Sequence, residues 1–288
     1  MQILIEKAHE FEYEMDPENS AMAKALTSLE LEAPFNQEIA SNIIALWQCP
    51  SIRKAFNRRK EFWILEAVEY YFNNIERIAD EDYQPTEEDT IMARVMTTGI
   101  ITTKITQPPL EFAVVDVGGQ RTERRKWMHV FDNVDILIYV VNLAGYNSCL
   151  FEDQTQNRMK ECFTLFQQTV NNPIFSKTPV FLLLNKKDLF ETKLREDPIT
   201  SCEVFSDYSG TKDVMECIAF VEQKFKNSVV LGDPSRVKCS YIAARYKKDV
   251  KGVWDEITGF LKEARKKEIE TAVKILGKGS LEETKVQE

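Results

Sequence analysis

Residues 180–188 read VFLLLNKKD, an unbroken apolar run that stops at an amide, two lysines and a carboxylate. A short apolar run with polar boundaries is typical of a strand that is buried on both faces, as in a parallel sheet. In open parallel sheets, ligands bind at the carboxyl ends of the strands. We therefore expect Asn185, Lys186 and Asp188 to lie at the ligand-binding edge of such a sheet.

Strands and helices alternate through the part of the chain that follows residue 94. The β-rich runs lie at residues 112–116, 136–142, 180–185 and 237–243. The segments between and after them that are long enough for helices lie at residues 154–170, 212–225 and 252–274. This alternation predicts an α/β fold with a doubly wound, mostly parallel sheet.

The preceding part of the chain has a different sequence pattern. No glycine precedes Gly99, and apolar residues recur at helical spacing. The clearest pattern predicts one amphipathic helix over residues 61–78. Shorter helical patterns lie at residues 3–15, 37–47 and 86–93. We therefore predict two domains, an all-helical domain over residues 1–92 and an α/β domain over residues 93–288 that ends in a polar tail.

The composition excludes several classes of function. A chain of 288 residues with 43% hydrophobic and 29% charged residues is expected to be a soluble globular protein. Its net charge of −9 argues against a nucleic-acid partner, since binding to phosphate backbones needs an excess of Lys and Arg. The six cysteines include no Cys-x-x-Cys pair, which argues against a zinc site. No apolar run is long enough for a transmembrane segment, so a cytoplasmic location is expected.

Two further polar segments have the composition of a phosphate and metal site. Residues 116–120 read DVGGQ and follow a predicted strand, and residues 94–99 read RVMTTG. Asp116 can organise Mg²⁺ through water, and the glycines allow a backbone N–H to face an anion. A hydroxyl and a guanidinium in the other segment can bind Mg²⁺ and phosphate oxygens. Taken alone, the two segments could equally be an ordinary turn and a solvated linker.

The NKKD segment has the composition of a guanine site. The carboxylate of Asp188 can accept two N–H donors from the edge of guanine, a pattern that adenine does not offer. Asn185 can bond the base and tie neighbouring loops, while the stem of Lys186 covers the base plane. The same four residues are also common in ordinary polar loops.

In combination and in this order, the three segments resemble those of the α subunits of heterotrimeric G proteins. The resemblance runs from near residue 1 to about residue 262 and includes RTERRKW at 121–127 and NRM at 157–159. It implies a Ras-like GTPase domain with an inserted all-helical domain, GTP or GDP and Mg²⁺ as ligands, and a signalling switch that hydrolyses GTP to GDP. The implied partners are a βγ dimer, a receptor and an effector, which would bring the protein to the inner face of the plasma membrane.

The resemblance also implies roles for matching residues. Arg94 would be the arginine supplied in cis that stabilises charge on the transferring phosphoryl group, and Gln120 would orient the attacking water. Thr97 would ligate Mg²⁺, Asp116 would hold the ion through a water, and Gly119 would donate its N–H to the γ-phosphate. The residues implied to bind the base are Asn185, Lys186, Asp188 and, through its backbone, Ala244.

The sequence departs from the family most clearly in its phosphate loop. The pattern Gly-x-x-x-x-Gly-Lys-Ser is not found, so the N-terminal helix, the first strand and this loop are expected to be missing. In the family that strand lies between the strands matching residues 112–116 and 136–142, which should therefore face a gap or pair with each other. The family's receptor-reading tail does not follow the last helix either, which argues against receptor coupling.

Two functions stay open at this point. One is a GTP-hydrolysing switch, favoured because both Arg94 and Gln120 are retained. The other is an interaction module or fragment that binds βγ or an effector through residues 121–127 without turnover, favoured by the missing phosphate loop. The sequence alone thus leaves open whether the chain is a working GTPase, and whether its short N-terminus is natural or reflects an incomplete gene model.

Overall fold

The computed structural model describes residues 1–30, 33–93, 95–108, 110–132 and 134–285. The chain forms two compact units. The first consists of Met1–Met96, Ala144–Thr164 and Asp197–Tyr208. The second consists of Thr97–Leu143, Leu165–Glu196 and Ser209–Glu288. The earliest division of the chain between the units thus falls after Met96, and the domain boundary between residues 92 and 93 stays a prediction.

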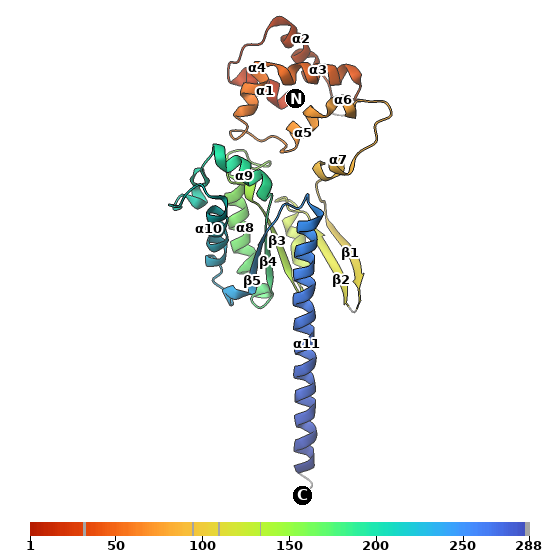
Figure 1. The fold of residues 1–288 in the computed structure, drawn as a ribbon, viewed down its shortest axis with the longest axis vertical. Helices are drawn as coiled ribbons and strands as arrows, with labels where there is room; N and C mark the ends of the chain where they lie inside the picture. Colours follow the sequence, from red (N-terminus) through yellow and green to blue (C-terminus); the bar gives the residue numbers. More distant parts are fainter. Residues whose placement is uncertain (31–32, 94, 109, 133, 286–288) are drawn as a thin grey trace. The chain divides into compact units, whose positions relative to one another are not determined.

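The N-terminal part of the first unit is helical. Its helices are α1 (Gln2–Glu10), α2 (Pro17–Thr27), α3 (Gln37–Gln48), α4 (Pro50–Asn57), α5 (Val68–Asn73), α6 (Ile75–Ile78) and α7 (Glu87–Met92) (Figure 1). Side chains cap the starts of α2 and α3, since Asp16 accepts the N–H of Asn19 and Asn36 that of Ile39, each at 2.9 Å. Such caps satisfy backbone donors that a helix N-terminus leaves without a partner in the helix.

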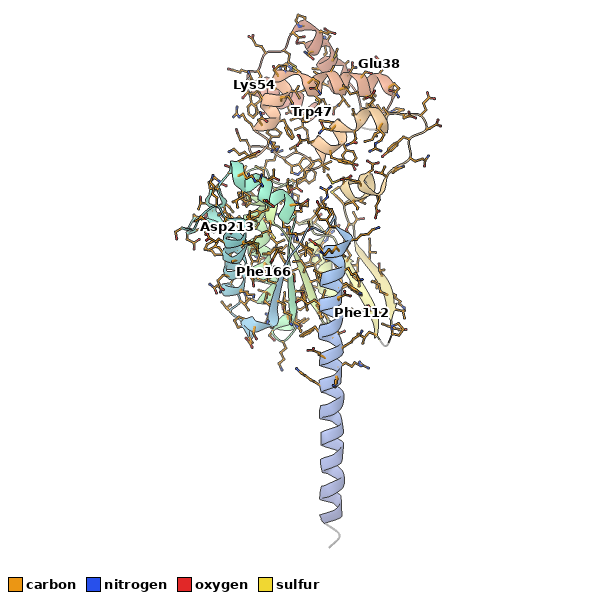
Figure 2. All side chains as sticks on the ribbon, in the orientation of Figure 1. Glu38, Trp47, Lys54, Phe112, Phe166 and Asp213 are labelled. Carbon is orange, nitrogen blue, oxygen red and sulfur yellow. The ribbon has the colours of Figure 1, made fainter. Side chains whose placement is uncertain are left out.

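These helices enclose an apolar core in which Trp47 makes the central contacts (Figure 2). Its ring packs edge-on against Phe56 and Phe72, with centroids 5.0 and 5.2 Å away. Its Nε1 donates to Oδ1 of Asn73 at 2.8 Å, which satisfies the polar end of a buried indole. The other buried members of this core are Leu4, Ile5, Ala8, Ala23, Leu26, Leu46, Cys49, Ile52, Ala55, Phe56 and Phe62.

The prediction of one helix over residues 61–78 is wrong. α5 begins only at Val68, and the helical conformation is interrupted at Asn74, before α6 begins. The side chain of Asn74 donates to the carbonyl oxygen of Tyr70 at 2.8 Å, a type of bond that competes with the helical ladder. In the non-helical part, the ring of Trp63 packs against Phe151 at 4.5 Å. The regularly spaced apolar residues of 61–78 therefore make several separate contacts and do not form one face of a single helix.

The second unit contains two sheets. β1 (Ile100–Gln107) pairs antiparallel with β2 (Leu110–Val117), and β3 (Leu137–Asn142), β4 (Val180–Asn185) and β5 (Val237–Tyr241) form a parallel sheet in that order. Within the described residues β2 and β3 do not pair, so the alternative in which these two strands pair with each other is wrong. β1 was missed in the sequence because nearly all its residues are exposed, and no buried face marks it as a strand.

Helices cover both faces of the parallel sheet (Figure 1). On one face, Phe166 of α8 (Arg158–Val170) packs against Tyr139 of β3 and Phe225 of α10 (Val214–Asn227), each at 5.1 Å. On the other face, Phe260 of α11 (Lys247–Lys285) packs against Phe181 of β4 at 5.8 Å. Alternate residues of a strand face opposite sides of the sheet. The two helical layers together therefore bury the first five residues of β4 and leave its last residue partly exposed. The α/β, doubly wound fold is as predicted.

α11 also contacts the antiparallel pair. Nε1 of Trp254 donates to Oε1 of Gln107 in β1 at 2.9 Å, and the same ring packs against Phe112 of β2 at 4.9 Å. One helix therefore packs on both sheets of the second unit. In the part of the chain that the structure describes, neither α11 nor any other helix is long and apolar enough to cross a membrane.

A buried carboxylate anchors α7 in the first unit. Asp89 is 3% exposed and accepts two bonds from the guanidinium of Arg77, at 2.8 and 2.9 Å, and one from the hydroxyl of Tyr70 at 2.7 Å. The bonds from Arg77 hold the pKa of Asp89 far below its usual range. Because the folded pKa lies below the unfolded one, this stabilisation is present above about pH 4 and is lost as the pH falls below it.

We expect Asp89→Asn to lower the Tm at pH 7 by about 5 °C or more, because the amide cannot replace the charged pair with Arg77. Circular dichroism melts from pH 7 to pH 3 measure this, with exposed Asp82→Asn as the matched control. The difference in Tm between wild type and Asp89→Asn should become smaller as the pH falls below about 4. A difference in Tm that stays constant from about pH 7 to pH 3 would rule out the carboxylate of Asp89 as its cause.

Candidate functional site

The carboxyl ends of β4 and β5 carry the first group of predicted residues. Two loops meet there, the β4 loop (residues 185–188) and the β5 loop (residues 242–245). Oδ1 of Asn185 accepts the backbone N–H of Ala244 at 2.9 Å and that of Lys186 at 2.7 Å. The N–H of Lys187 donates to the carbonyl of Ile242 at 3.1 Å. These bonds fix the two loops to each other at one edge of the parallel sheet.

A second set of contacts joins both loops to Asp249 in α11. Nζ of Lys187 pairs with Oδ2 of Asp249 at 2.7 Å, and the same oxygen accepts the N–H of Ala243 at 2.8 Å. The bond from Lys187 lowers the pKa of Asp249, so this carboxylate stays ionised and holds both loops. Lys186 has a φ of 64°, a left-handed conformation that costs an ordinary residue about 1 kcal/mol or more. The network of bonds on either side of Lys186 maintains it.

Asp188 lies in the first turn of α9 (Lys187–Glu196), a helix that the sequence reading missed. A carboxylate is favoured there by the helix dipole. NH1 of Arg245 approaches Oδ2 of Asp188 to 3.7 Å, which is too long for a hydrogen bond. An ionised carboxylate offers about four lone-pair positions, so Asp188 can accept two further N–H donors.

The second group of predicted residues lies on two other loops, the threonine loop (residues 97–99) and the glycine loop (residues 116–123). Oγ1 of Thr97 donates to Oδ2 of Asp116 at 3.1 Å. This pair of hard oxygen atoms suits Mg²⁺. Within the described residues, no group of three or more His, Cys, Asp or Glu side chains is placed to hold a metal. A Mg²⁺ ion here would therefore take its other ligands from water and from a bound phosphate, as this ion commonly does.

Gly118 is the point where the two loops pack against each other. A Cβ at this position would lie 2.7 Å from the carbonyl oxygen of Thr97 and 2.8 Å from Cβ and Cγ of Glu123. The N–H of Gly118 donates to the carbonyl of Gly99 at 3.2 Å, and its own carbonyl accepts Nε1 of Trp127 at 2.9 Å. Only a residue without a side chain fits this approach without moving the threonine loop.

The neighbouring positions of the glycine loop are more open. Gly119 is exposed, and a Cβ there would meet nothing within 4 Å, so there is open space on that side of its backbone. Gln120 is half-buried, and its carbonyl accepts the N–H of Glu123 at 2.9 Å. This bond begins the turn that leads into the 3₁₀ helix η1 (Arg124–His129) and fixes the backbone of Gln120.

Hydrogen bonds thus sort the predicted residues into two groups, one around Thr97 and Asp116 and one around Asn185 and Ala244. Arg94 lies outside the described residues. Sequence reasoning missed Glu123 and Asp249, which support the two groups. No pattern marked them, because the contacts of Glu123 with Gly99 and of Asp249 with Lys187 join segments that are far apart in the chain.

We expect Gly118→Ala to lower the Tm by about 5 °C or more, because the added methyl group must displace the backbone of the threonine loop. Gly119→Ala is the matched control and should change the Tm by less than about 2 °C, since its methyl group enters open space. Thermal melts without any ligand measure both. Equal Tm values for the two variants would contradict the packing described for Gly118.

Comparison with known proteins identifies the family to which the chain belongs. The family model of the G-protein alpha subunit matches residues 1–261, which include the N-terminal helices and both sheets. The guanine nucleotide-binding protein alpha-8 subunit of Dictyostelium discoideum is 46% identical over 284 residues, which cover 97% of this chain and 70% of that protein. The predicted resemblance and fold class are therefore confirmed, and the chain belongs to the G-protein α-subunit family.

Proposed function

We propose that this protein is a guanine-nucleotide switch that binds GTP and GDP with Mg²⁺ and hydrolyses GTP. Family membership supports the signalling switch in general, and G-protein α subunits generally bind these nucleotides with Mg²⁺. The observation that carries the assignment to particular residues is the bond from the N–H of Ala244 to Asn185. It joins two loops at the carboxyl ends of adjacent parallel strands, where such sheets bind their ligands.

The β4 and β5 loops are the proposed base site. Guanine presents two adjacent N–H donors, and both can bond the carboxylate of Asp188, at about 1.5–3 kcal/mol for each charge-assisted bond. At the same two positions adenine presents an unprotonated ring nitrogen, which is an acceptor, and a C–H group, so its acceptor would face the negative charge. Asn185 holds the backbone N–H of Ala244 in position beside the base, and the stem of Lys186 covers the base plane.

The threonine and glycine loops are the proposed phosphate side. Thr97 would ligate Mg²⁺ directly and Asp116 would do so through a water, while the bound ion neutralises charge on the phosphoryl oxygens. Gly119 would donate its N–H to the γ-phosphate, and Gln120 would orient the attacking water. Arg94 would stabilise the charge that develops on the transferring group. The open surroundings of Gly119 and the hydrogen-bonded backbone of Gln120 support these roles.

The 288 residues do not contain a Gly-x-x-x-x-Gly-Lys-Ser loop. That loop would supply backbone N–H groups and a lysine to the phosphates. Within the 288 residues, the groups that we propose to hold the nucleotide are the base contacts and Mg²⁺.

The partners that the family implies are a βγ dimer, a receptor and an effector. We propose that residues 121–127 of this chain contact a βγ dimer or an effector and that such partners place it at a membrane surface. We further propose a helical domain over residues 1–92 and a Ras-like domain over residues 93–288. The family match does not favour the alternative of a module without turnover.

Gln120→Leu tests the proposed hydrolysis, because leucine is similar in size but can neither donate a hydrogen bond to the water nor accept one from it. We expect the rate of GTP hydrolysis at saturating nucleotide and Mg²⁺ to fall at least about tenfold, with the Kd for GTP changed by less than about twofold. Exposed Gln84→Leu is the control and should leave both unchanged. Wild-type chain that binds GTP without hydrolysing it would instead support the module without turnover.

A further inference from the structure

Glu123 joins the threonine loop to the glycine loop and has none of the roles described so far. Its Oε2 accepts the backbone N–H of Gly99 at 2.5 Å and the Nζ of Lys126 at 2.6 Å. The side chain of Glu123 is only 13% exposed. The carboxylate therefore reaches back along the chain to a backbone group that directly precedes β1.

Both of these bonds are charge-assisted, which makes them stronger than bonds between neutral groups. The bonds from Lys126 and Gly99 lower the pKa of Glu123, so its ionised form is the one that holds the loop. Gly99 has a φ of 78°, a left-handed conformation natural for glycine. The sharp turn that this residue makes points its N–H at Glu123 and leads the chain into β1.

Gly99 is bonded to the glycine loop on both of its polar groups. Its N–H donates to Glu123, and its carbonyl accepts the N–H of Gly118 at 3.2 Å. Gly118 in turn is enclosed between the carbonyl of Thr97 and the side chain of Glu123, as its missing Cβ shows. While these contacts last, Gly118 therefore cannot shift without a shift of the threonine loop.

We propose that Glu123 is a positioning residue that makes the threonine and glycine loops move as one body. The inference rests on the proposed function, in which Thr97 on one loop and Gly119 and Gln120 on the other serve the same phosphate. The proposed function gives Glu123 no contact with the nucleotide or the metal. It sets the geometry of hydrolysis by keeping Thr97 in register with the residues that position the attacking water.

Hydrogen exchange without nucleotide tests the contact itself. In Glu123→Ala the amides of residues 97–100 should exchange at least about tenfold faster than in wild type, because the acceptor of the Gly99 N–H is removed. Glu123→Gln, which keeps an acceptor but loses the charge, should fall between the two. Exposed Glu111→Gln is the matched control and should exchange like wild type. Unchanged exchange in Glu123→Ala would overturn the inference, whether or not the chain binds nucleotide.

Single-turnover GTP hydrolysis tests the coupling. Glu123→Ala should lower the rate at least about tenfold with the Kd for GDP within about twofold of wild type, and Glu123→Gln should restore part of the rate. Faster exchange with an unchanged rate would overturn the inference and leave the proposed function standing. If the wild-type chain did not hydrolyse GTP at all, the proposed function would fail, and with it the role of Glu123 in hydrolysis. The exchange data would then still decide whether Glu123 joins the loops.

Discussion

The packing of α11 against two sheets that share no strand pair is the contact on which the second unit depends. Within the described residues β2 and β3 are not hydrogen-bonded to each other, and α11 contacts β1 and β2 through Trp254 and β4 through Phe260. The threonine and glycine loops flank the antiparallel pair, whereas the base loops follow the parallel sheet. Side-chain packing on α11 therefore helps to set the distance between the two groups of residues that form the proposed site.

The lack of a β2–β3 pair also explains an unusual surface. Strands of parallel sheets are commonly buried on both faces, yet Ile138 and Val140 of β3 are 41% and 55% exposed. β4, one strand further in, is buried over its first five residues. Within the sheet, burial is thus most complete in β4, whose last residue begins the β4 loop. The bonds of Asn185 and Asp249 then hold the β4 and β5 loops to each other.

Sequence patterns predicted the parts of the fold that repeat over several residues. The apolar run before Asn185 predicted β4, and the order of the three polar segments predicted the family. The roles of the site residues stay predictions. Sequence patterns failed where a single contact determines the local structure. The bond of Asn74 to Tyr70 ends a helix that periodicity would continue, and β1 lacks a buried face. Glu123 and Asp249 resemble ordinary surface charges until folding brings Gly99 and Lys187 beside them.

Base discrimination by the 288-residue chain tests the central claim, that the β4 and β5 loops bind guanine, most directly. Calorimetric titrations with GDP, inosine diphosphate and ADP in the presence of Mg²⁺ separate the contributions, because inosine lacks only the amino donor of guanine. We predict a Kd for GDP at least about tenfold below those for the other two, with the difference reduced in Asp188→Ala. Equal binding of the three nucleotides, or no binding of GDP at submillimolar concentration, would contradict the account.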